Sequence, residues 1–351
     1  MTSGKVKHKT RLRSIINYAI SLLLAAVFLY IAFNGVDINE VARIVSESSI
    51  LWMIIFLLVQ LSAHFVRALR WKVIISSVKP EASVKYLFGA LMVGYGVNCV
   101  VPRLGEITRA VLAGKWENLS RSSMFGTVIL ERVIDIIFLG IAVVVAVLFF
   151  SDSLLESFPW LQSALYMTII AIALVILIFY LIITQREKFY NLVVKFFSVF
   201  SEKLAHKIAS IIQMIGDGFG SLKGRKNYIW AFLLSALLIV QYALGSYIGF
   251  FIVDMQNISE VTLEMGWIVM CISAIGIVIP TPGGTGSYHT LAKSTLVILF
   301  GFPEALSLAY AFITHAIGYF FAIFLSLIIF FVFNKQHDNL IKVVETEIED
   351  L

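Results

Sequence analysis

The sequence predicts an all-α polytopic membrane protein with about six full spans and two re-entrant helical hairpins in an inverted repeat. Apolar residues make up 60% of the 351-residue chain and charged residues only 14%, whereas a typical soluble domain has about 25% charged residues. Several apolar stretches reach the roughly 20 residues that a helix needs to cross a bilayer. The charge of the connecting segments also alternates in sign along the chain.

Six apolar stretches are long enough to form full spans within a single transmembrane domain, residues 1–351. The first follows a basic N-terminus, and its apolar run is longer than that of a signal peptide, so we expect it to remain as a helix. The predicted spans are Ser14–Phe33, Ser49–Leu69, Ser122–Phe149, Trp160–Thr184, Tyr228–Val253 and Glu304–Phe333.

Two shorter apolar stretches end at proline and glycine residues. Tyr86–Val101 stops at Pro102, and Trp267–Ile279 stops at Pro280–Gly286. Proline and glycine end helices, and non-helical backbone within the bilayer is tolerated only where protein or water shields it. We therefore predict two re-entrant hairpins, with two kinked ordinary spans as the alternative. Broken apolar segments in corresponding halves of a chain indicate a transporter's binding site.

The connecting charges predict the orientation, because cytoplasmic loops of membrane proteins are enriched in lysine and arginine. We therefore expect the chain in the inner (cytoplasmic) membrane, with both termini on the cytoplasmic side. The first hairpin then enters from the cytoplasm and the second from outside. The repeat halves cover about 14–149 and 160–333. Residues 185–227 form a basic cytoplasmic connector, either an amphipathic interfacial helix or a structural brace, and 334–351 form a cytoplasmic tail.

Ionisable residues within membrane segments are costly and are therefore candidates for function. Those of the second span could instead snorkel at the helix end, and Arg132 with Asp135, three residues apart, could form a purely structural ion pair. The candidates for substrate binding fall in three groups: Arg67, near His64 and Arg70; Asn98, Arg103, Glu106 and Arg109; and Glu131, Arg132 and Asp135.

These residue types predict an anion site. A half-helix is expected to begin near Leu104 and another near Thr285, and helix N-termini attract anions. Arginine forks suit phosphate, so we expect an anionic lipid headgroup as the ligand. Glycines allow a ligand to approach the backbone closely. The candidates at the second break are Pro280, Gly283, Gly284 and Gly286.

Two histidines in the second half, His289 and His315, are possible proton sites, although a packed, hydrogen-bonded histidine is the simpler interpretation. We expect no metal site and no cofactor. The two cysteines are too few for a metal site, and the glycine-rich break lacks the lysine of a P-loop. The net charge of +5 is attributed to membrane topology, so no nucleic acid is expected as a partner.

Four motifs occur in order along the chain: Arg67-x-x-Arg70-Trp71, Asn98-x-x-x-Pro102-x-x-Gly105-Glu106-x-x-Arg109, Glu131-Arg132-x-x-Asp135 and Pro280-Thr281-Pro282-Gly283-Gly284-x-Gly286. They resemble the flippase-like family of the lysylphosphatidylglycerol synthase transmembrane region, which includes the membrane half of the multiple peptide resistance factor. The resemblance implies translocation of aminoacylated phospholipids or polyprenyl-phosphate-linked sugars. His289 departs from the acid that the family often has there, and we expect no soluble aminoacyl-transfer domain.

The leading hypothesis is therefore a lipid flippase or a transporter of a lipid-linked substrate. It would move an anionic phospholipid or a polyprenyl-phosphate-linked molecule and would not act as an enzyme. One alternative is a membrane enzyme acting on a lipid phosphate, which would usually show a nucleophile or a metal cluster. The other is a non-transporting scaffold of envelope assembly. The lipid, the coupling ion and the oligomeric state stay open at this point.

Overall fold

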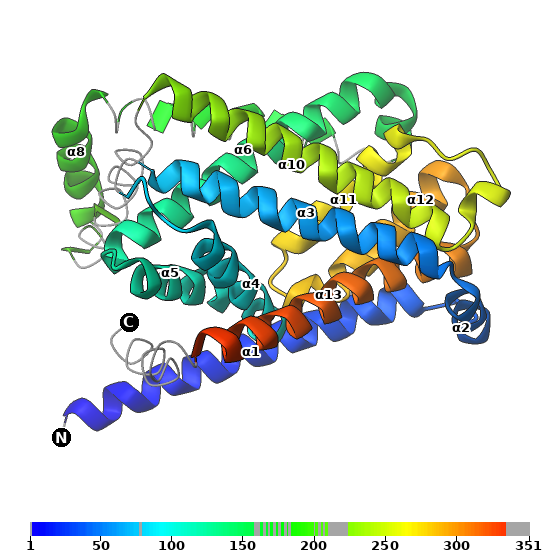
Figure 1. The fold of residues 1–351 in the computed structure, drawn as a ribbon, viewed down its shortest axis with the longest axis horizontal. Helices are drawn as coiled ribbons and strands as arrows, with labels where there is room; N and C mark the ends of the chain where they lie inside the picture. Colours follow the sequence, from blue (N-terminus) through cyan, green and yellow to red (C-terminus); the bar gives the residue numbers. More distant parts are fainter. Residues whose placement is uncertain are drawn as a thin grey trace. The chain divides into compact units, whose positions relative to one another are not determined.

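The computed structural model describes residues 2–76, 79–157, 224–334 and shorter stretches between 162 and 209, and most of these residues lie in helices (Figure 1). Those residues contain no strand, which confirms the predicted all-α class. Parts of the predicted span Trp160–Thr184, much of the connector 185–227 and nearly all of the tail 334–351 lie outside the described residues.

The helices keep the labels of Figure 1. They are α1 (Thr2–Phe33), α2 (Ile38–Glu47), α3 (Ile50–Ile75), α4 (Val84–Val100), α5 (Leu104–Glu117), α6 (Arg121–Ser157), α8 (Arg186–Ser198), α10 (Arg225–Ile252), α11 (Leu263–Val278), α12 (Ser287–Phe300) and α13 (Glu304–Asn334), with single 3-10 turns η1 (Met255–Asn257) and η2 (Pro282–Gly284).

Four of the described helices are long and apolar enough to cross a membrane by length and composition: α1, α3, α10 and α13. Each covers one of the predicted full spans, apart from the end residues Ser49 and Val253, and α6 contains the predicted span Ser122–Phe149. Several helices extend beyond the predicted spans: α1 already begins at Thr2, α3 continues to Ile75 and α6 continues to Ser157. A helix can extend past its apolar run, since lysine and arginine are themselves good helix formers.

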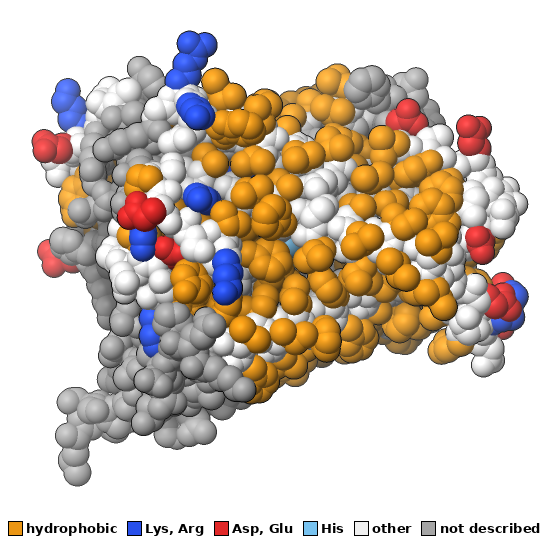
Figure 2. All heavy atoms as spheres, viewed as in Figure 1, with side chains coloured by type: hydrophobic (Ala, Val, Ile, Leu, Met, Phe, Trp, Pro, Cys, Tyr) orange, Lys and Arg blue, Asp and Glu red, His pale blue; other side chains and the backbone are white. Residues whose placement is uncertain are grey.

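The outer faces of these helices are apolar. On α10, Trp230, Phe232 and Leu237 are all exposed, and so are Leu51 and Leu58 on α3. Figure 2 shows hydrophobic side chains covering the visible surface over these two helices, with charged side chains mainly near the helix ends. A soluble monomer rarely exposes an apolar patch of more than a few hundred Å². A lipid bilayer is the environment in which such surfaces are stable.

Helix α2 was not predicted, because the acidic segment after the first span was interpreted only as a loop. Its start is capped by the Asp37 carboxylate, which accepts hydrogen bonds from the backbone N–H groups of Asn39 (2.8 Å) and Glu40 (3.4 Å). An acidic N-cap with Glu three residues later is a recognised helix start. The sequence therefore contained the signal for this helix.

The chain divides into two compact units, and each is described by itself. Unit 1 comprises Met1–Leu61, Met92–Glu106 and Gln241–Leu351, and unit 2 comprises Ser62–Leu91 and Ile107–Val240. In unit 1, α12 packs against α1, α11 and α13. Its core includes Phe250, whose ring lies 5.3 Å from that of the fully buried Tyr310.

Unit 2 has a small core in which three helices meet. Ile74 of α3, Leu130 of α6 and Ala231 of α10 are buried against one another. This packing sets the register of the three helices. It places Arg70, one turn before Ile74, close to Glu131, the neighbour of Leu130, and to Ser235, one turn after Ala231.

Candidate functional site

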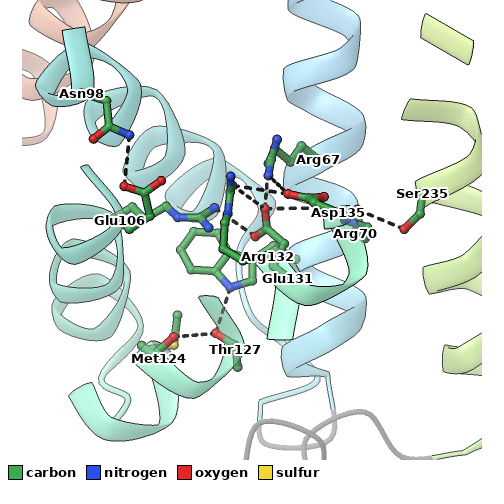
Figure 3. A network of polar contacts seen from close by, with 12 residues as sticks. Arg67, Arg70, Asn98, Glu106, Met124, Thr127, Glu131, Arg132, Asp135 and Ser235 are labelled. Atoms are coloured by element: carbon green, nitrogen blue, oxygen red, sulfur yellow. Dashed lines mark hydrogen bonds and ion pairs between the residues drawn. The ribbon is translucent and has the colours of Figure 1, made fainter. Parts of the chain in front are cut away.

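The main polar feature of unit 2 is a cluster of six ion-paired side chains, called the arginine cluster below (Figure 3). Arginines from three different helices converge in it on two acids of α6. Its members are Arg67 and Arg70 of α3, Arg109 of α5, and Glu131, Arg132 and Asp135 of α6.

Glu131 is the centre of the arginine cluster and is fully buried. Its carboxylate accepts hydrogen bonds from Arg67 Nε at 2.7 Å and Arg109 Nη1 at 2.9 Å, and Arg70 Nη2 lies 3.3 Å away. A buried carboxylate is very costly to desolvate unless it is paired and hydrogen-bonded. Three guanidinium groups around one carboxylate satisfy this requirement.

Asp135, one helical turn further on, accepts from the same two arginines of α3. Arg70 Nη2 lies 2.5 Å from its carboxylate, and Arg67 donates to its other oxygen. Arg70 Nη1 also donates to the Ser235 hydroxyl of α10 at 3.0 Å. Each acid is thus shared by several arginines. Ser235 was not predicted from the sequence, because no residue near it in the chain indicates that its hydroxyl accepts a hydrogen bond from an arginine.

The snorkelling interpretation of the second span is wrong. Arg67 is 7% exposed and Arg70 only 1% exposed, and both pair with the acids of α6 instead of reaching a helix end in solvent. Snorkelling does not occur because the carboxylates of Glu131 and Asp135 lie next to this face of α3 and pair with both arginines. The predicted i, i+3 pair of Arg132 and Asp135 does form, but at 3.5 Å it is one of the longer contacts in the arginine cluster.

Arg132 differs from the other arginines of the cluster because its side chain is 38% exposed. Its contacts to Glu131 (3.4 Å) and Asp135 (3.5 Å) are long, and both acids accept shorter hydrogen bonds from other arginines. Among the described residues, its buried Nε has no hydrogen-bond partner. Arg132 therefore combines accessibility with a charge that is only weakly compensated, which suits it to bind an external anion.

The ring of Trp71 packs against the arginine cluster through Arg109. The Arg109 guanidinium lies 5.2 Å from its centroid, a cation–π distance. Trp71 is fully buried, and its indole Nε1–H donates to Thr127 Oγ1 at 3.0 Å. Trp71 belongs to the motif that carries the family resemblance, but its role as a platform for Arg109 was not predicted.

The break between α4 and α5, in unit 1, is closed by its own side chains. Asn98 Oδ1 accepts from the Gly105 N–H at 2.7 Å, and Asn98 Nδ2 donates to Glu106 at 3.2 Å. Asn98 therefore occupies one of the N–H groups that we expected to bind an anion at the start of α5. The exposed Arg103 has a φ of 67° and forms the turn itself. Of the second predicted group, Glu106 pairs with Asn98, whereas Arg109 belongs to the arginine cluster.

The break between α11 and α12 requires glycine. Gly283, Gly284 and Gly286 have φ values of 58°, 77° and 88°, which side chains with a Cβ rarely adopt. The following helix begins at Ser287, close to the expected start near Thr285. Pro280 is exposed at the end of α11. A Cβ on Gly286 would lie 2.6 Å from the backbone oxygen of Ala25, so this turn packs directly on α1.

The two histidines lie next to each other at this second break. Their ring centroids are 4.6 Å apart, with His289 on α12 and His315 on α13. His289 Nδ1 accepts from the Gly286 N–H at 3.2 Å, and His315 Nε2 lies 3.0 Å from the Gly283 carbonyl. Both are packed and hydrogen-bonded, and the structure brings together two residues that the sequence predicted only separately.

Comparison with known proteins agrees with the resemblance drawn from the motifs. The family model of the lysylphosphatidylglycerol synthase transmembrane region matches residues 18–326. A UPF0104 membrane protein of Methanocaldococcus jannaschii is 22% identical over 340 residues, which cover 91% of this chain and 96% of that relative. A UPF0104 membrane protein of Methanothermobacter thermautotrophicus is 23% identical over 235 residues, covering 62% and 67% of the two chains. No solved structure is significantly similar to the chain.

Proposed function

Because the chain belongs to the lysylphosphatidylglycerol synthase transmembrane-region family of integral membrane proteins, we propose that it moves an anionic lipid or lipid-linked molecule across the membrane without changing it chemically. The observation that carries this proposal is Arg132, whose side chain is 38% exposed at the edge of the arginine cluster. A phosphate headgroup offers the planar, charge-assisted contacts that arginine forms best.

The geometry of the arginine cluster favours binding over acid–base chemistry. Glu131 and Asp135 each accept from at least two arginines. A carboxylate whose charge is held by several guanidinium groups is a poor general base, because its lone pairs are already occupied. We therefore propose that these acids position the arginines, and that the chain is a transporter and not a lipid-modifying enzyme.

The proposed topology has six full spans and two re-entrant hairpins in an inverted repeat, with both termini on the cytoplasmic side of the inner membrane. Two observations support it. Each half of the chain contains a short helix pair interrupted by proline and glycine, α4 with α5 and α11 with α12. In α11 and α12 the two short helices also pack against each other, as in a hairpin. Interrupted helices in corresponding halves are typical of transporter binding sites.

Transport and covalent chemistry are separated by one experiment. Purified protein in liposomes is expected to move a fluorescent phosphatidylglycerol between leaflets while mass spectrometry finds the lipid unchanged. The Arg132→Gln variant should bind the lipid about tenfold more weakly, the lower end for a charge-assisted contact because the side chain is partly exposed. Arg43→Gln is the matched control, since Arg43 forms an exposed ion pair with Glu47 on α2.

Three outcomes would contradict the proposal. A product of altered mass without leaflet exchange would favour the membrane enzyme. Neither exchange nor a new product with any anionic lipid would favour the scaffold. Equal lipid affinity in Arg132→Gln and Arg43→Gln would remove Arg132 from the binding site, even if transport is observed.

A further inference from the structure

The turn between α11 and α12 is held at both ends by imidazole rings. At one end, the Gly286 N–H donates to Nδ1 of His289, and at the other, Nε2 of His315 contacts the Gly283 carbonyl. His289 is only 3% exposed. Gly283 packs closely on α13 as well, since a Cβ there would lie 2.6 Å from the Tyr319 ring. Helices α12 and α13 therefore each hold one end of the same short turn.

These two contacts assign the position of the proton on each ring. A backbone N–H only donates, so His289 Nδ1 must carry a lone pair, and its proton is then on Nε2. A carbonyl only accepts, so His315 must carry a proton on Nε2. Adding a proton to Nδ1 of His289 would place two N–H groups against each other. Adding one to Nδ1 of His315 would leave its bond to Gly283 intact.

We propose that Nδ1 of His289 is a proton-binding site, and that a proton bound there releases Gly286 and opens the turn at the start of α12. Three features of the structure favour release of the Gly286 N–H over a small shift of the ring that would keep the turn closed. The imidazolium would stand in the first turn of α12, where the helix dipole is positive. The second imidazole, 4.6 Å away, would repel it. The glycines of the turn can adopt other backbone conformations at little cost.

The neighbouring helices offer few competing proton sites. Histidine is the side chain that ordinarily changes its charge between pH 5 and 8. Among the described side chains of α1, the end of α4 from Met92 on, α11, α12 and α13, the other titratable groups are phenols, two thiols, one lysine and two carboxylates in the first turns of their helices. They are Tyr18, Tyr30, Tyr95, Tyr288, Tyr310, Tyr319, Cys99, Cys271, Lys293, Glu264 and Glu304, the last lying 2.8 Å from Lys293.

The proposal of a proton-binding site depends only on the geometry of this turn. The proposal that proton binding drives transport also rests on the proposed function. A turn that opens when His289 takes up a proton and closes when it loses it would link a proton gradient to the conformation of the second break. The proton is then the coupling ion, taken up from the more acidic side of the membrane and released on the other.

Hydrogen–deuterium exchange of the purified protein tests the proton site. In peptides covering residues 280–290, exchange corrected for its intrinsic pH dependence should rise about two- to tenfold between pH 8 and pH 5, the effect of losing one hydrogen bond. The variant His289→Gln should stay protected across this range, because its carbonyl accepts from Gly286 as in a capping box but does not titrate. His315→Gln, whose amide still donates to Gly283, should keep the response to pH.

The same response in the wild-type protein and in His289→Gln would overturn the proposal. If the glutamine variant does not fold, nitrogen NMR of histidine-labelled wild-type protein tests the proposal instead. The expected result is that Nδ1 of His289 gains its proton over the same pH range in which the Gly286 amide signal shifts. A Gly286 amide signal that does not shift would overturn the proposal. Lipid transport measured over the same pH range is a separate result. A transport rate that does not change with pH would refute proton coupling alone. The absence of transport at every pH would refute the proposed function alone.

Discussion

Replacing Glu131 by glutamine is expected to destabilise the protein by about 3–5 kcal/mol, the usual effect of removing one partner of a buried ion pair. Glu131 is fully buried and is the shared acceptor of Arg67 and Arg109. Without its charge, the arginines would repel one another in a low-dielectric environment. A typical protein is stable by only about 5–15 kcal/mol, so thermal unfolding in detergent should show a large fall in the midpoint.

The matched control is Glu47→Gln, which breaks the ion pair with Arg43 on α2. Both of those side chains are about 60% exposed, and such surface pairs contribute about 0–1 kcal/mol. Adding Arg132→Gln to Glu131→Gln should restore part of the stability, because it removes one unpaired positive charge. Equal midpoints for Glu131→Gln and Glu47→Gln would show that the arginine cluster does not depend on Glu131.

Replacing Gly286 by alanine is expected to cost about 2–6 kcal/mol through two separate effects. The backbone of Gly286, with a φ of 88° and a ψ of −61°, is strained for any residue with a Cβ, which costs about 1–3 kcal/mol. The new methyl group would also lie 2.6 Å from the backbone oxygen of Ala25 and 2.9 Å from Cβ of Phe28. Forcing an extra carbon into a packed site typically costs about 1–3 kcal/mol more.

Gly301→Ala separates these effects. Gly301, after the last turn of α12, has a φ of 69°, but a Cβ there would have no neighbour within 4 Å. This variant should therefore lose only the roughly 1–2 kcal/mol of backbone strain. The difference between the two unfolding midpoints measures the packing of the turn on α1, together with the extra backbone strain of Gly286, whose ψ of −61° lies outside the left-handed helical region that Gly301 adopts. If the two variants are equally stable, that close packing is absent.

The sequence by itself determined the helical class and most of the helix positions. Apolar runs of spanning length predicted α1, α3, α10 and α13, because a bilayer selects for length and hydropathy, which are properties of consecutive residues. Proline at position 102 and the glycines of 283–286 marked the breaks for the same local reason. The pair of Arg132 and Asp135 also followed from spacing along one helix.

Only the tertiary structure decided which charged residues meet. Arg67 and Glu131 are 64 residues apart and Arg109 and Glu131 are 22 apart, so no local periodicity relates them. The packing of Ile74, Leu130 and Ala231 brings their helices into register and makes Arg70 a buried partner instead of a snorkelling side chain. His289 and His315 likewise became neighbours only through the packing of α12 on α13. Ion pairs and hydrogen bonds act over a few ångströms of space, and sequence patterns describe distance along the chain.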